Sequence, residues 1–224
     1  VLRQKMTDAG VDPEILVTQM PILRFMKEKQ LSPIACSPEY EDLKLVRTQG
    51  LEAIPAERRE NYVSDIQGFI DQTQSPRFKL YTSRSLVKDF VPLTEEDTVK
   101  DFFAERILLD ECIATRVSLW AVLRPDSLVC VVVPLNTVRY LGGSNGRIPR
   151  VSRFLSPDSV IDEDLVTTIL INPSAEETLS QTRYLRLEIG TSPDVLQYQT
   201  KVADYLWFST MPKVNMLPRM MNER

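Results

Sequence analysis

The sequence predicts an α+β fold with a mainly antiparallel β-sheet or sandwich, an N-terminal helical segment and a C-terminal helix. Three features indicate this class: helix-type signals before residue 75, short apolar runs joined by turn residues in the middle, and a capped amphipathic segment after Ser192. The runs are joined by short turns rather than helices, which disfavours a parallel sheet. We therefore expect a helical arm at 1–75, a β-rich core at 76–209 and a tail at 210–224.

The N-terminal segment carries the clearest helix signals. Ser37 fits an N-cap with Pro38 in the first turn, and Gly50 fits the end of that helix. A second predicted helix, Pro55–Gln72, places apolar residues along one stripe with charged residues opposite. Such an arm packs either on the chain's own core or on a neighbouring subunit, and the second case predicts homo-oligomers.

Two elements are predicted between this arm and the centre of the chain. Ser75-Pro76 marks a change of composition, and Arg77–Tyr81 after it has the composition of a short strand. Thr94 fits the N-cap of a third helix, because acidic residues fill the next positions and Val99 begins an apolar face. This helix is expected to lead into the central strands.

The centre of the predicted sheet is a β-hairpin within Thr115–Leu141. Thr115–Leu123 alternates between two unlike faces, and Leu128–Leu135 is almost continuously apolar. The residues between them, 124–127, include the turn formers Pro125 and Asp126. The second run is expected to be covered on both sides, so that Cys130 is buried.

Composition excludes several classes of chemistry. The chain has 224 residues, a net charge of −4 and no histidine, which removes His-containing triads and His-containing metal sites. Its three cysteines have no metal-type spacing and are predicted to be buried free thiols. No apolar run is long enough to span a bilayer, and the first ten residues lack a signal-peptide pattern. We expect an intracellular, cytoplasmic protein, in the host cytoplasm if viral, with no cofactor or metal.

The one locally basic region is a glycine-containing loop at 139–153. Three of the seven glycines lie at 142, 143 and 146, which predicts a mobile turn at a hairpin tip. Arginines on such a loop beside an aromatic residue either bind phosphates and bases, bind carboxylates of a partner, or keep the loop soluble. The candidate nucleic-acid or anion-binding residues are Arg139, Tyr140, Arg147, Arg150 and Arg153.

The remaining elements complete the predicted core. Strands are expected at Leu165–Ile171 and Arg183–Ile189, followed by a helix of about fifteen residues that Ser192 caps. The acidic turn at 156–164 lacks the ligand spacing of a calcium loop, so we expect solvated carboxylates there. The tail at 210–224 contains four methionines, which favour adaptable contacts with a partner.

Three classes of function follow from these observations. The first is a non-catalytic assembly or interaction protein that self-associates or binds another protein; the predicted architecture is similar to that of viral coat, matrix or movement proteins. The second is a protein that binds single-stranded nucleic acid through the arginine loop at 139–153. The third is a domain of a carboxylate-based, histidine-free enzyme.

Overall fold

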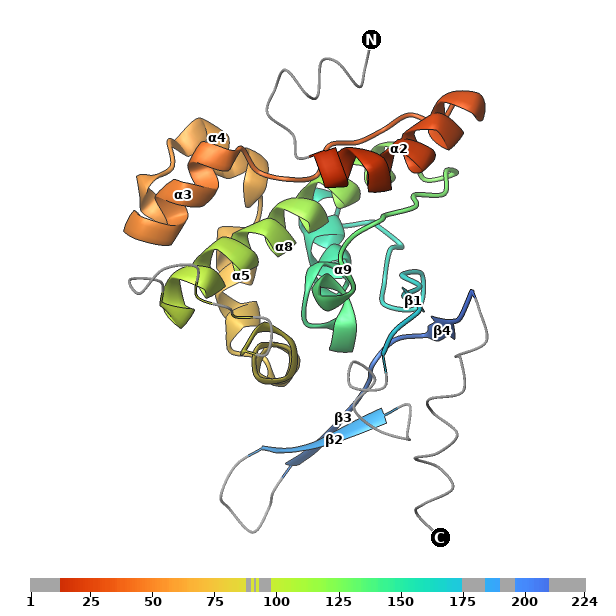
Figure 1. Ribbon diagram of the computed structural model, residues 1–224. Coiled ribbons are helices and arrows are strands. Elements are labelled where there is room, and N and C mark those ends of the chain that lie inside the picture. Colours follow the sequence, from red (N-terminus) through yellow and green to blue (C-terminus); the bar gives the residue numbers. More distant parts are fainter. Residues whose placement is uncertain are drawn as a thin grey trace, which may run out of the picture. The chain divides into compact units, whose positions relative to one another are not determined.

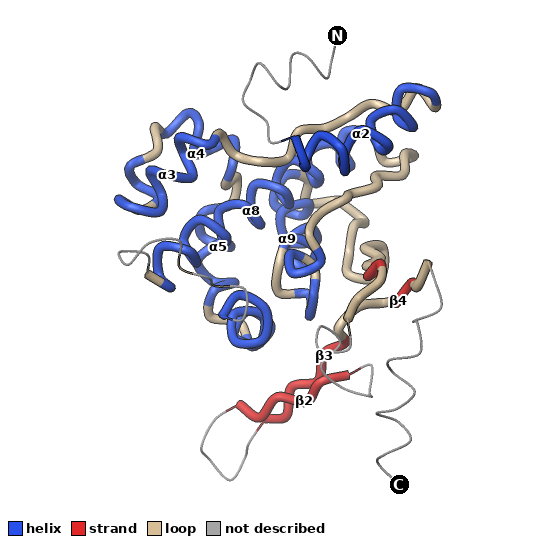
Figure 2. Tube along the Cα trace, in the orientation of Figure 1, coloured by secondary structure: helices blue, strands red, loops and turns tan. Residues whose placement is uncertain are grey.

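Figures 1 and 2 show the computed structural model, which describes residues 13–87, 90, 92, 98–174, 184–189 and 196–209. The chain divides into two compact units, residues 1–35 and 36–224. In the first unit the described element is helix α2 (Pro13–Glu28), which contains Pro21. Every element described below belongs to the second unit.

The described residues are mostly helical, so the predicted antiparallel sheet or sandwich is wrong. Their strands form two small sheets of two strands each. Strand β1 (Ile169–Ile171) pairs in parallel with β4 (Tyr205–Trp207), and β2 (Tyr184–Ile189) pairs antiparallel with β3 (Leu196–Lys201). The main body is instead built around one long helix, α8 (Val99–Leu123), as Figure 1 shows.

Four short helices precede residue 75 in this unit: α3 (Tyr40–Gln49), η1 (Leu51–Ala53), α4 (Ala56–Tyr62) and α5 (Ile66–Thr73). The predicted helix ending at Gly50 is confirmed, with Glu39 rather than Ser37 at its N-cap. The second predicted helix is two helices, because Asp65 caps a new one by accepting a hydrogen bond from the Gly68 N–H. Val46, Ile54, Tyr62 and Val63 pack with Leu108 and Cys112 of α8.

The predicted strand at Arg77–Tyr81 is wrong, because these residues form helix α6 (Pro76–Tyr81). The Ser75 hydroxyl accepts a hydrogen bond from the Phe78 N–H, and Pro76 occupies the first turn. The Ser-Pro pair is therefore a helix start. The π-helical turn η2 (Thr82–Leu86) continues directly from α6.

The predicted hairpin is also wrong, because Thr115–Leu123 is the last third of α8. Thr98 caps this helix, with its hydroxyl accepting from the Asp101 N–H; the predicted start at Thr94 lies outside the described residues. Ile113, Ala114 and Val117 are buried against α9, which is helical spacing. Burial of this stripe overrides the β propensity of Val and Thr.

Apart from Leu135, the apolar run after the predicted turn forms neither strand nor helix. Residues 128–134 follow α8 as a loop, drawn in tan in Figure 2. Cys130 is exposed, Cys112 is buried and Cys36 is partly buried. The expectation of a buried Cys130 at the centre of a sheet is therefore wrong.

The glycine-containing region is a tightly packed turn and helix instead of a mobile hairpin tip. It contains η3 (Leu135–Thr137), η4 (Arg139–Leu141) and helix α9 (Ser144–Leu155). A Cβ at Gly146 would lie 1.7 Å from the Leu141 carbonyl oxygen, and one at Gly143 would lie 1.9 Å from that of Thr137. These glycines are needed because the backbone passes closely over itself.

The C-terminal part agrees with the sequence in two of three elements. Ile169–Ile171 lies within one predicted strand, and β2 matches the other. The predicted helix after Ser192 is wrong, because strands β3 and β4 occupy the described part of that segment. The tail at 210–224 lies outside the described residues. Leu170 packs with Leu80, Tyr140, Val202 and Ala203, which joins β1 to the helical body.

Candidate functional site

Helices α8 and α9 enclose a group of charged side chains in the interior. Glu111 of α8 and Arg147 of α9 are both fully buried, and Arg147 Nη1 donates to Glu111 Oε2 at 2.9 Å. Arg150, one turn further along α9, donates from Nη2 to both Glu111 oxygens at 2.6 and 2.7 Å. Its Nη1 also donates to Asp65 Oδ2 at 2.7 Å. We call Asp65, Glu111, Arg147 and Arg150 the buried charge cluster.

The surroundings of Arg147 explain how a guanidinium is tolerated in the interior. Its guanidinium carbon lies 5.8 Å from the ring centroids of both Phe69 and Phe78. An aromatic face attracts a cation, and this attraction is larger when water is excluded. One carboxylate and two aromatic rings therefore hold the fully buried charge.

A second fully buried carboxylate, that of Asp110, lies beside the cluster. It accepts hydrogen bonds from the Tyr81 hydroxyl at 2.6 Å and from the Ser144 hydroxyl at 3.0 Å. Burial raises the pKa of the Asp110 carboxyl, against the opposing charges of Arg106 and Arg147. Burial also raises the pKa of the Tyr81 hydroxyl well above its ordinary value, and the neighbouring carboxylate adds to this.

These interior groups join elements that are far apart in the sequence. Asp110 connects α8 to α6 and to the start of α9, while Glu111 connects α8 to the middle of α9. Each carboxylate is surrounded by donors from the chain itself and has no exposed surface. In this arrangement they position helices, because a substrate would have to displace these partners to reach them.

The five candidate nucleic-acid or anion-binding residues lie in different environments. Arg139, Tyr140 and Arg147 are buried, whereas the Arg150 side chain has 19% of its surface exposed and Arg153 is exposed. The structure brings Arg147 and Arg150 together on Glu111; Arg153 points its Nε to the Pro149 carbonyl oxygen in its own helix. Nucleic-acid binding through this set stays a prediction, and Arg153 is its exposed member.

The carboxylate partners of these arginines were missed by the sequence analysis. Asp65 and Glu111 lie 85 and 39 residues from Arg150, so no local pattern connects them. Arg147 and Arg150 are three residues apart, which places both on one face of a helix. A helix predicted at 144–155 would have placed both arginines near a common partner. The glycines and Pro149 favoured a loop instead.

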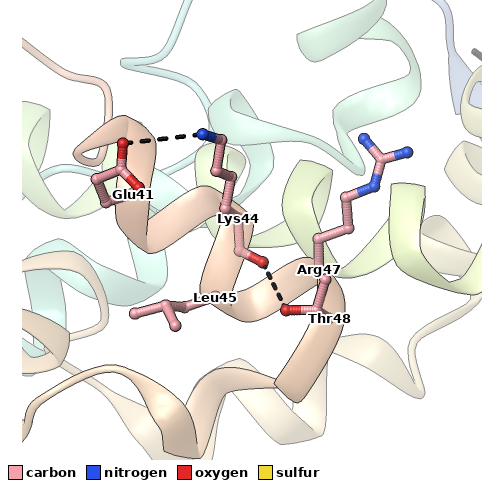
Figure 3. Close-up of a pocket in the computed structure, with 5 residues that line it drawn as sticks. All are labelled: Glu41, Lys44, Leu45, Arg47 and Thr48. Carbon is pink, nitrogen blue, oxygen red and sulfur yellow. Dashed lines mark hydrogen bonds and ion pairs between the residues drawn. The ribbon is translucent and has the colours of Figure 1, made fainter.

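A depression of about 340 Å³ lies along α3. Figure 3 shows the residues that line it. Glu41, Lys44, Leu45, Arg47 and Thr48 line it, and they all belong to this one helix. The Glu41–Lys44 ion pair spans 3.9 Å, and Arg47 pairs with Glu105 of α8 at 3.6 Å. These are the contacts of an ordinary helix surface, and no polar groups from other elements converge there among the lining residues.

The most unusual surface feature is Leu128–Val133, with the sequence LVCVVV. Val129 and Val133 pack on the cluster of α8 and α9, while Leu128, Cys130 and Val132 face outward. Leu128 is 93% exposed and Val132 is 67% exposed. Among the described residues, no backbone N–H or C=O of this segment forms a hydrogen bond. We call it the unpaired segment.

Among the described residues, no three side chains of His, Cys, Asp or Glu gather in a group able to hold a metal ion. In the same part of the chain, no helix has the length and apolar character needed to cross a membrane. Comparisons with protein-family models, with curated proteins and with solved structures found no match.

Proposed function

We propose that this chain is a non-catalytic interaction protein that self-associates through the unpaired segment. The observation that supports the proposal most strongly is that residues 128–133 combine exposed apolar side chains with backbone groups that form no hydrogen bond to any other described residue. Six uncharged residues with four valines have high β propensity and no proline. A second strand laid along this segment would satisfy its backbone and cover its outward side chains.

A second copy of the same segment fits this requirement. Antiparallel pairing about a two-fold axis makes the two strands equivalent, so that only residues at the axis face their own counterparts. No like charges come into contact, because the segment has no charged residue. Val129 and Val133 stay packed on their own helices, so pairing needs no rearrangement of the core. The segment therefore offers backbone hydrogen bonds and apolar contacts at the same place.

The environment of the carboxylates favours this class over a carboxylate-based enzyme. Asp110 and Glu111 are fully buried and hold hydrogen bonds from Tyr81, Ser144, Arg147 and Arg150. The similarity to viral structural proteins depended on a β-rich body, which the described residues lack, so the proposal does not extend to that class.

The experiment uses Cys130 as a natural cross-linking site. A chain with Cys36→Ser and Cys112→Ala keeps Cys130 as its only cysteine, and companion chains carry the single cysteine at another position of 128–133. Paired Cα atoms in an antiparallel ladder lie about 4.5–5.5 Å apart, which is within the reach of a disulfide. Mild oxidation should therefore produce a covalent dimer at the one or two positions nearest the two-fold axis.

The matched control places the single cysteine at Val160, which is 75% exposed and lies outside the unpaired segment. Random collisions would cross-link this control as fast as any position in 128–133. If the single-cysteine chains with a cysteine in 128–133 cross-link no faster than the Val160 control, the proposal is wrong. A pattern with one maximum inside 128–133 supports it and gives the register of the pairing.

A further inference from the structure

A second apolar surface lies on the small sheet of β1 and β4. The register pairs Ile169 with Tyr205 and Ile171 with Trp207, so these four side chains project from one face of the sheet. Each of them is between 50% and 65% exposed, whereas Leu170 projects from the opposite face and is buried. We call the surface formed by these four side chains the β1–β4 face.

The ends of this sheet are fixed within the chain. Asn172 follows β1, and its N–H donates to the Trp207 carbonyl oxygen at 2.7 Å. The Asn172 side chain accepts from the Ser209 N–H at 2.8 Å and donates to the Ser209 hydroxyl at 2.8 Å. The face is therefore held in a defined conformation before any partner binds, which lowers the entropy lost in docking.

The surrounding sequence has the composition of the centre of an interface. Residues 165–174 and 205–209 include no charged side chain, in a chain where 26% of residues are charged. The face contains a tryptophan and a tyrosine, two residue types that are enriched where proteins bind each other. An apolar face with these aromatic residues and no charge indicates a protein partner.

The arrangement of the side chains is self-complementary. Isoleucines form one column along β1 and aromatic residues form a parallel column along β4. A two-fold axis that runs parallel to the strands, midway between two stacked sheets, places the isoleucine column of each copy over the aromatic column of the other. We propose that the β1–β4 face binds the same face of a second copy in this way.

The area of the face limits the strength of this contact. At these exposed fractions, four side chains offer on the order of 500 Å² on each copy. A pair then buries about 1,000 Å², which is the lower limit for a specific interface. The contact is therefore weak and concentration-dependent.

This inference extends the proposed self-association by naming a second two-fold interface. The unpaired segment and the β1–β4 face do not share residues. One two-fold interface produces a dimer, whereas two different ones in the same chain connect dimers into larger assemblies. The full chain is thus expected to exceed a dimer at high concentration.

Trp207 reports on the face directly. With Trp120→Phe, Trp207 is the only tryptophan, and its emission and its quenching by acrylamide are measured over a wide range of concentration. Dilution should shift the emission to the red and increase quenching. Ile171→Lys should give the red-shifted, strongly quenched signal at every concentration, while Val160→Lys, at an exposed position outside the face, should behave as the parent.

Light scattering separates this inference from the proposed function. Val132→Lys and Ile171→Lys should each leave dimers, and the double variant should be a monomer. If Ile171→Lys leaves the parent's mass and Trp207 shielding unchanged, the β1–β4 inference is wrong while the proposed function stands. If Val132→Lys alone changes nothing, the proposed function is wrong while the β1–β4 contact stands. If the emission and the acrylamide quenching of Trp207 do not vary with concentration, no second copy covers the β1–β4 face and the inference is wrong.

Discussion

Glu111→Ala is the most severe single test of the buried charge cluster. The substitution removes the acceptor of Arg147, which has no exposed surface, and the main acceptor of Arg150. An unpaired buried charge costs about 3–5 kcal/mol, out of a free energy of unfolding of about 5–15 kcal/mol for a typical domain. For a unit of this size the midpoint of thermal unfolding should fall by roughly 6–20 °C.

The matched control is Glu163→Ala, which removes an exposed ion pair with Arg77. Such a pair contributes about 0–1 kcal/mol, so the control should unfold within a few degrees of the parent. Circular dichroism during heating and in urea measures both variants. Equal shifts for the two would refute the argument that Glu111 neutralises interior charge, and so would an unchanged midpoint for Glu111→Ala.

The packed turn, the thiols and the Asp110 carboxylate can each be tested by a variant or by labelling. In urea unfolding, Gly146→Ala should lower the free energy of unfolding far more than Gly50→Ala. A Cβ at position 146 would meet backbone atoms, whereas Gly50 has open space around it and only a positive φ of 87°. Equal losses of stability in the two variants would contradict the close approach of the backbone at Gly146. Cys130 should be alkylated rapidly in the native protein and Cys112 only after denaturation, because Cys130 is exposed and burial raises the pKa of Cys112 to about 11. Mass spectrometry of labelled peptides measures which cysteine reacts first, and rapid labelling of Cys112 in the native protein would contradict its burial. Because the pKa of Asp110 is raised in the folded state, its folded form binds the proton more tightly, and stability is lost as pH rises from the ordinary carboxyl pKa through the raised one. Relative to Asp110→Asn, the parent should therefore be more stable at acidic than at neutral pH, and a difference that does not change with pH would refute this.

The sequence predicted the end of one helix correctly, at Gly50, whereas the predicted N-caps at Ser37 and Ser192 are wrong. Gly50 ends α3 with its N–H bonded to the Val46 carbonyl oxygen. Ser75 and Pro76 also have the pattern of a helix start, but the β-type composition of the residues that follow them predicted a strand instead. Local hydrogen bonds of this kind depend on neighbouring residues alone, so the sequence contains the information for them.

The interior of the fold depends on contacts that the sequence does not express locally. Alternation over Thr115–Leu123 suited a strand, yet the segment continues a helix that Thr98 starts seventeen residues earlier. Leu128–Val133 has the composition of a strand but forms a loop in the structure, because an apolar run does not reveal whether its faces are covered. The arginines of α9 lie in the interior because Glu111 and Asp65 meet them there, and both are distant in sequence.

Self-association through the unpaired segment can be measured as the mass of the chain in solution, by light scattering as a function of concentration. The comparison is between the parent, Val132→Lys and the matched control Val160→Lys, since both valines are exposed and both variants add the same charge. Self-association through the unpaired segment predicts that the mass of the parent and of Val160→Lys rises with concentration, while Val132→Lys reaches a smaller mass at high concentration. A parent that is monomeric throughout, or a Val132→Lys variant with the parent's mass, would contradict it.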